Sequence, residues 1–173
     1  RRLGGLRTLM PVTFVIATMA ALSMAGTPLL NGFLSKDMML EEANHTVLFN
    51  APWLVPAFAT FGSLFSAAYC FRLIGHTFFG PVRDDYPAKP HDPPAGLWLP
   101  PAILEVLVVV IGVAPFLAEP FVKLVTASVL GGEADVPKAY FKIWHGLVPA
   151  LYMSIAAILG GLVMLALFKP ALR

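Results

Sequence analysis

Lys36 is the residue with the clearest capacity for chemistry, because it follows an apolar run long enough to be a membrane span. Residues 12–34 carry no charge, and their polar side chains are hydroxyls and one amide. A lysine at membrane depth costs about 2.5–3.5 kcal/mol on insertion scales, so it usually serves ion or proton movement. Because burial disfavours the charged ammonium, such a lysine can accept a proton from one side and release it to the other. The alternative is a side chain that reaches the interface or pairs structurally.

A proline and two glycines on the N-terminal side of Lys36 predict a break in the helix that carries this lysine. Pro28 lacks a backbone donor, and the flanking Gly26 and Gly32 loosen the helix. Irregular backbone at membrane depth is tolerated where it lines a cavity or packs against protein. A broken helix with a lysine beside the break predicts a transporter. An ordinary proline kink in a structural helix is the alternative.

Three acidic residues are weaker candidates for an ion or proton path. Asp37 and Glu41 are four residues apart on one helix face, which forms either an acidic lining near the outer exit or a solvated outer face. Glu105 lies among Val, Leu and Ile, where a lone carboxylate needs a partner or access to water. It is an ion ligand, a proton stop or the partner of a lysine elsewhere, unless Pro100 and Pro101 shift it toward the surface.

His145 and Cys70 complete the candidates. His145 follows Trp144 at the start of the last apolar run, and an imidazole titrates near neutral pH, so it could join an outer proton path. An interfacial Trp-His pair is the alternative. The single Cys70 excludes an internal disulfide and a Cys-rich metal site. The sequence also lacks a phosphate loop, a metal-spaced His/Glu cluster and a nucleophile triad, so we predict no cofactor, no metal and no enzymatic chemistry.

The composition is that of a membrane protein. Hydrophobic residues make up 58% of the chain and charged residues 13%, whereas a soluble domain has about 25% charged residues. No basic stripe with interleaved aromatics is present, so we expect no nucleic-acid partner. The chain starts with Arg1 and Arg2 and is short for a complete transport pathway, so we expect a fragment of a larger bundle.

Four apolar stretches are long enough to cross about 30 Å of hydrocarbon, so the predicted fold is all-α and polytopic, with a discontinuous first span. The predicted spans are residues 12–46, 53–79, 97–118 and 144–168. Residues 80–96 are dense in proline and polar, which predicts an exposed loop. Residues 119–143 predict an outer segment with a short amphipathic helix near residues 120–130.

The Lys and Arg residues predict the orientation of these spans. Eight of them lie on one side of the predicted membrane and three on the other, with Lys36 inside it. Because the side richer in Lys and Arg usually faces the cytoplasm, the lead-in 1–11, the loop 80–96 and the end 169–173 are expected to be cytoplasmic.

The segment from Gly26 to Asp37, GTPLLNGFLSKD, resembles the antiporter-like subunits shared by respiratory complex I and Mrp-type multisubunit Na+/H+ antiporters. It is most similar to the MnhA/PhaA-type subunit of Mrp antiporters, whereas NADH-quinone oxidoreductase chain 5 more often has Thr-Ala-Gly-Phe before its Ser-Lys. The loop around residues 90–94, the stretch 117–130 and residues 144–146 also fit. Asp37 occupies a position that is often glutamate in this branch.

The resemblance implies a membrane portion of an Na+/proton antiporter subunit, with downhill proton influx driving sodium export. Lys36 would be the proton relay at the outer end of a hydrophilic axis along the membrane midplane. The implied partners are the other hydrophobic subunits, the lipid bilayer, Na+ and H+, in a bacterial inner membrane. Two alternatives stay open: a proton-pumping subunit of complex I or a membrane-bound hydrogenase, and a purely structural membrane scaffold.

Overall fold

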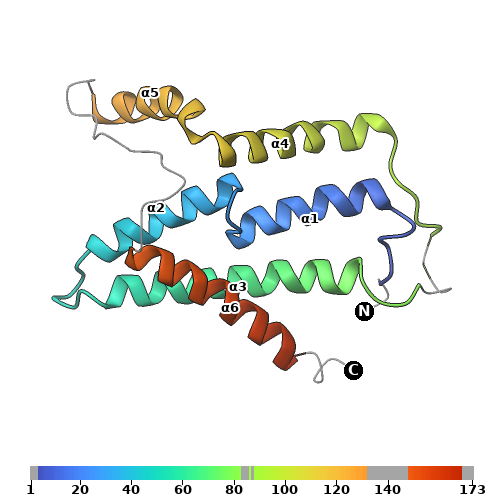
Figure 1. Cartoon of the computed structure of the whole chain (residues 1–173), viewed down its shortest axis with the longest axis horizontal. Helices are drawn as coiled ribbons and strands as arrows, with labels where there is room; N and C mark the ends of the chain where they lie inside the picture. The colour runs from blue at the N-terminus through green and yellow to red at the C-terminus, as the bar shows by residue number, and fades with distance from the viewer. Residues whose placement is uncertain (1–3, 83–85, 87, 132–147, 169–173) are drawn as a thin grey trace.

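The computed structural model describes residues 4–82, 86, 88–131 and 148–168 (Figure 1). Within these ranges the chain is helical, with no strand beyond an isolated bridge between Leu48 and Ala51, which confirms the predicted all-α fold. The helices are α1 (Pro11–Ala25), α2 (Asn31–His45), α3 (Leu54–Thr77), α4 (Ala95–Val113), the short 3-10 helix η1 (Pro115–Leu117), α5 (Glu119–Leu130) and α6 (Pro149–Phe168).

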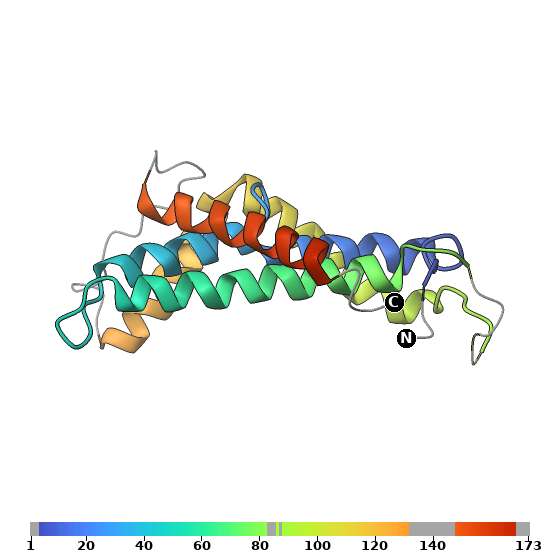
Figure 2. The same cartoon turned by 90° about the horizontal axis from the view of Figure 1, so that it is seen from below.

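Helices α3, α4 and α6 are each long and apolar enough to cross a membrane. The 15 residues of α1 are apolar but extend only about 22 Å, less than the hydrocarbon thickness. Helix α2 has the same length and a more polar sequence, and it follows α1 after residues 26–30. Figures 1 and 2 both show α1 and α2 following one another along α3, so the segment predicted as the first span is divided into two helices.

The observed ends of the later helices follow from proline positions. Helix α4 begins after the extended Pro94 and ends at Val113, because Pro115 starts the separate helix η1. Pro100 and Pro101 lie inside α4 and do not interrupt it. Helix α5 covers the region of the expected amphipathic helix, and α6 begins at Pro149.

The described core is built from small side chains on α1, α3 and α6. Ala21 and Ala25 of α1 pack with Ala67 and Cys70 of α3. Helix α6 also approaches α3 closely, since a Cβ added to Gly161 would lie 2.8 Å from the backbone nitrogen of Ala68. Small residues let membrane helices approach this closely, and close approach brings their backbones into van der Waals contact.

Candidate functional site

The end of α1 has a left-handed turn that satisfies two of its last four backbone carbonyls. Gly26 has φ 85°, a conformation that favours glycine. Its N–H donates to the carbonyl of Ser23 at 3.0 Å, and the Thr27 N–H donates to the carbonyl of Leu22 at 3.1 Å. This pair of bonds is the Schellman arrangement at helix C-termini. The carbonyls of the following two residues are left without backbone donors from this motif.

Lys36 supplies those donors from α2. Its Nζ donates to the carbonyl oxygens of Met24 and Ala25, both at 3.3 Å. The C-terminus of a helix carries about half a negative charge, so the ammonium is attracted to this position as well as hydrogen-bonded there. Lys36 is therefore partly buried against the break, and it links the ends of the two half-helices.

Ser23 connects the same two helix ends on the side of α2. Its Oγ donates to Asn31 Oδ1 at 3.1 Å and accepts the Gly32 N–H at 3.3 Å. Between the helices Leu29 has φ 72°, a left-handed conformation that costs a non-glycine residue about 1–2 kcal/mol. Such strain persists only where its surroundings impose it, and it is concentrated at functional sites.

The three predicted break residues occupy different positions. Gly26 is the left-handed residue after α1, and Pro28 lies in the turn that follows. Gly32 lies in the first turn of α2 rather than in the break itself. Glycine is needed at position 32 because it is small: a Cβ there would collide with the carbonyl oxygen of Ser23. Helix α4 also packs closely against the break, since a Cβ on Gly112 would collide with the carbonyl oxygen of Leu29.

Replacing Gly26 with alanine should disturb Lys36 as well as the backbone. The new Cβ would lie 2.9 Å from the Lys36 Cδ, and the left-handed conformation would cost a further ~1–2 kcal/mol. Gly131→Ala is the matched control, because Gly131 follows α5 with φ 82° and has no atom within 4 Å of its Cβ position. We expect Gly26→Ala to lower the melting temperature of the protein below that of Gly131→Ala, because only Gly26→Ala adds a collision to the cost of the left-handed conformation. Equal melting temperatures in the two variants would show that the contact between Gly26 and Lys36 does not matter.

The candidate acids differ in how far this chain buries them. Asp37 is only 5% exposed, so within this chain it does not lie on a solvated face, while Glu41 is partly exposed. Glu105 is partly buried in α4, and its Oε2 has no hydrogen-bond partner among the described residues. Within the same residues Glu105 and Lys36 form no ion pair. His145 lies outside the described residues.

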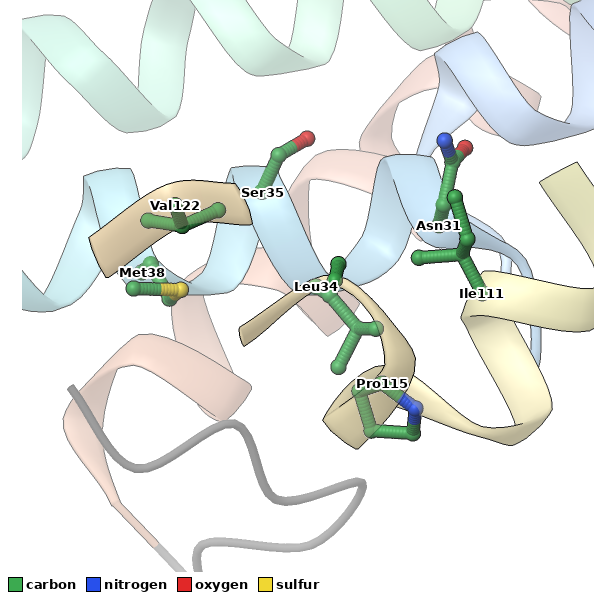
Figure 3. Close-up of a pocket in the computed structure, with 8 residues that line it drawn as sticks. Asn31, Leu34, Ser35, Met38, Ile111, Pro115 and Val122 are labelled. Atoms are coloured by element: carbon green, nitrogen blue, oxygen red, sulfur yellow. The ribbon is translucent and has the colours of Figure 1, made fainter. Parts of the chain in front are cut away.

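A cavity of about 460 Å³ lies on one side of α2, facing the end of α4, η1 and α5 (Figure 3). Its lining residues are Asn31, Leu34, Ser35, Met38, Ile111, Pro115, Ala118 and Val122. Only Asn31 and Ser35 contribute polar side chains, and none of these residues is ionisable. Lys36 is not part of the lining, so this cavity is separate from the contact between Lys36 and the end of α1.

Sequence reasoning did not identify the acceptors of Lys36 or the role of Ser23. A partial signal was present, because α1 ends in an apolar sequence with no basic residue in its last turn. Its final carbonyls therefore needed donors from elsewhere, and Lys36 is the nearest cation along the chain. Ser23 stands one turn before the glycine that ends α1, which is a weaker signal.

Comparisons with known proteins place this arrangement in a family. Residues 1–66 match the family model described as the transmembrane region of NADH:quinone oxidoreductase and Mrp antiporters. A probable K(+)/H(+) antiporter A/B subunit of Rhizobium meliloti (strain 1021) is 40% identical over 164 residues, covering 94% of this chain and 16% of the relative. Residues 1–66 are thus a match to the membrane domain shared by NADH:quinone oxidoreductase and Mrp antiporters, and nearly the whole chain is similar to antiporter subunits. This confirms the resemblance carried by residues 26–37.

A further relative and a solved structure show the same similarity to antiporter subunits. The A1 subunit of an Na(+)/H(+) antiporter of Staphylococcus haemolyticus (strain JCSC1435) is 36% identical over 180 residues, covering 100% of this chain and 22% of the relative. The structure of an Mrp complex from Dietzia sp. DQ12-45-1b matches with a TM-score of 0.78 and 32% identity, over 98% of this chain and 18% of that chain. The chain thus spans about a sixth to a fifth of the length of the antiporter subunits it matches. These similarities, together with the three apolar helices among the described residues, support a multi-pass membrane protein.

Proposed function

We propose that this chain is the part of a monovalent cation/proton antiporter subunit that carries a proton relay at Lys36. The observation that carries the proposal is the contact of the Lys36 ammonium with the last two carbonyls of α1 inside a broken span. The names of the relatives, which are antiporter subunits, support a transporter rather than an enzyme.

The proposed mechanism uses the charge of Lys36. A charged ammonium makes hydrogen bonds about twice as strong as a neutral amine does, and only the ammonium is attracted to the negative helix end. When Lys36 releases its proton, the contact between α2 and the end of α1 weakens. A proton arriving from the other side restores it. Protonation of Lys36 therefore biases the two half-helices between a closed and a looser arrangement about the break.

The other candidate residues have supporting roles in this proposal. Asp37 and Glu41 lie on the outer part of α2 and would carry protons between Lys36 and the outer side, together with His145. Glu105 would be a second acid on α4. We place both ends of the chain in the cytoplasm of a bacterium and the subunit in its inner membrane. Its partners would be the other hydrophobic subunits of the complex.

The names of the relatives differ in the cation that is exchanged for protons. The relative from Rhizobium meliloti is named for K+ and the one from Staphylococcus haemolyticus for Na+. A second candidate function, a proton-pumping subunit driven by redox chemistry elsewhere, is favoured by the inclusion of NADH:quinone oxidoreductase in the matching family.

The test uses the full-length subunit in its complex, in inverted membrane vesicles that hold an imposed pH gradient reported by a quenched dye. Additions of Na+, K+ or choline at equal ionic strength should give dequenching with one or both alkali cations and none with choline. That result supports the antiporter function and identifies the transported cation. If neither alkali cation causes dequenching but NADH oxidation acidifies the vesicles, the redox-driven pump replaces it.

A further inference from the structure

The N-terminus of α1 is capped by a residue from the loop between α3 and α4. Met10, which precedes the helix, makes no side-chain capping bond. Instead Asp92 Oδ2 accepts the Val12 N–H at 3.1 Å, and its Oδ1 accepts the Thr13 N–H at 3.0 Å and the Thr13 hydroxyl at 2.8 Å. A carboxylate at this position satisfies amides that have no helical partner, and the positive end of the helix stabilises it.

Asp92 is held as an ionised carboxylate. Desolvation opposes its ionisation, but the hydrogen bonds from Thr13 and Val12, together with nearby His91, outweigh this effect. The pKa of Asp92 therefore lies below the usual value of an aspartate. At neutral pH the cap is charged.

The surrounding segments fix the loop to the same end of the molecule. The backbone amides of Leu6 and Arg7 donate to the carbonyls of Thr77 and Phe78 at 3.4 and 3.2 Å. The Tyr86 hydroxyl donates to the carbonyl of Gly4. The segment before α1 is thus held to the end of α3 and to the loop that carries Asp92.

Helix α1 connects this cap to Lys36 as one uninterrupted helix. Its only proline is its first residue, and it contains no glycine, so nothing inside it absorbs a displacement. Near the break it packs on α3 through the short side chains of Ala21 and Ala25, and near its other end the Phe14 ring lies 5.3 Å from the ring of Phe78. A charged side chain thus contacts each end of α1, the Asp92 carboxylate at its first turn and the Lys36 ammonium at its last.

We propose that Asp92 is a positioning residue for Lys36, because it sets the axial position of α1 and thereby the place of the two carbonyls that receive the ammonium. The inference rests on the proposed role of Lys36, but it assigns a role to a residue outside the break. It differs from a purely local cap, which would stabilise the first turn of α1 without affecting its far end.

The experiment uses Asp92→Ala and Asp92→Asn in the full-length complex, with Asp92→Glu as the conservative rescue. Glu119→Gln is the matched control, because Glu119 pairs with Lys123 on α5 at 2.6 Å. Nitroxide labels at Met24 on α1 and Met39 on α2, which are 59% and 54% exposed, report the distance across the break by pulsed EPR. Cation-driven dequenching is measured on unlabelled protein with the same substitutions at Asp92.

We expect Asp92→Ala to shift or broaden the label distance distribution and to lower the maximal exchange rate about five- to tenfold, the effect of one lost cap. Asp92→Glu should restore both toward wild type, and Glu119→Gln should change neither. An unchanged distance distribution in an assembled Asp92→Ala complex would overturn the inference. A changed distance distribution in Asp92→Ala with full exchange activity would overturn it as well. If Lys36→Ala itself leaves exchange intact, the proposed function fails, whereas the label distances still decide whether Asp92 positions α1.

Discussion

Replacing Lys36 with alanine should abolish cation-driven dequenching in vesicles while the complex still assembles. The substitution removes the amine that we propose as the proton carrier, and it leaves the carbonyls of Met24 and Ala25 without the Lys36 donor. Groups that transfer protons typically contribute about 100-fold or more to the rate of the process they serve. Dequenching is measured after assembly has been checked by native gel electrophoresis.

Lys36→Arg separates the two functions of the side chain. An arginine keeps a positive charge and donors for the end of α1, but it does not release its proton in proteins. We expect Lys36→Arg to assemble at least as well as Lys36→Ala and to be equally inactive. Lys123→Ala is the control, because Lys123 lies exposed on α5 beside Glu119. Exchange at the wild-type rate in an assembled Lys36→Ala complex would show that Lys36 is structural.

Replacing Gly32 with alanine should disrupt the break itself. A Cβ at this position collides with the backbone carbonyl oxygen of Ser23, and backbone cannot move aside as a flexible side chain would. Overpacking of this kind costs about 1–3 kcal/mol. The bonds from Ser23 to Asn31 and Gly32 would be lost with it, at about 1 kcal/mol each. We expect little assembled complex, and a lower melting temperature for whatever assembles.

Two glycines of α3 provide the comparison for Gly32. Gly62 and Gly75 have no atom of this chain within 4 Å of the position that a Cβ would take, and both lie inside a helix. Alanine is favoured over glycine there by about 0.5–1 kcal/mol, so Gly62→Ala and Gly75→Ala should be neutral or slightly stabilising. Thermal unfolding followed by size-exclusion chromatography ranks the three variants. A melting temperature of Gly32→Ala equal to that of Gly75→Ala would show that α1 and α2 do not approach as closely as described.

Much of the fold follows from local sequence. The long apolar runs of α3, α4 and α6 determine that these segments are helices, because a membrane leaves few other ways to satisfy the backbone. The break was also predictable, since Gly26 and Pro28 each disfavour a continuing helix by their own chemistry. The family resemblance was carried by the same residues.

The geometry around the break was not predictable, because it depends on residues brought together by the fold. The approach of Gly32 to Ser23 and of Gly112 to Leu29 requires the helices to be placed first. The sequence predicts that Gly32 loosens the helix, whereas its function in the structure is close packing. The link between Asp92 and Thr13 joins residues 79 positions apart, and no local pattern specifies such a pairing.

The contact between Lys36 and the end of α1 also has a consequence for hydration. The carbonyls of Met24 and Ala25 need hydrogen-bond donors at all times, since an unsatisfied backbone group in a membrane interior is costly. In the relay that we propose, the Lys36 side chain leaves these carbonyls when it passes on its proton, and water is the donor available to replace it. The proposal therefore couples each departure of the lysine to hydration of the break.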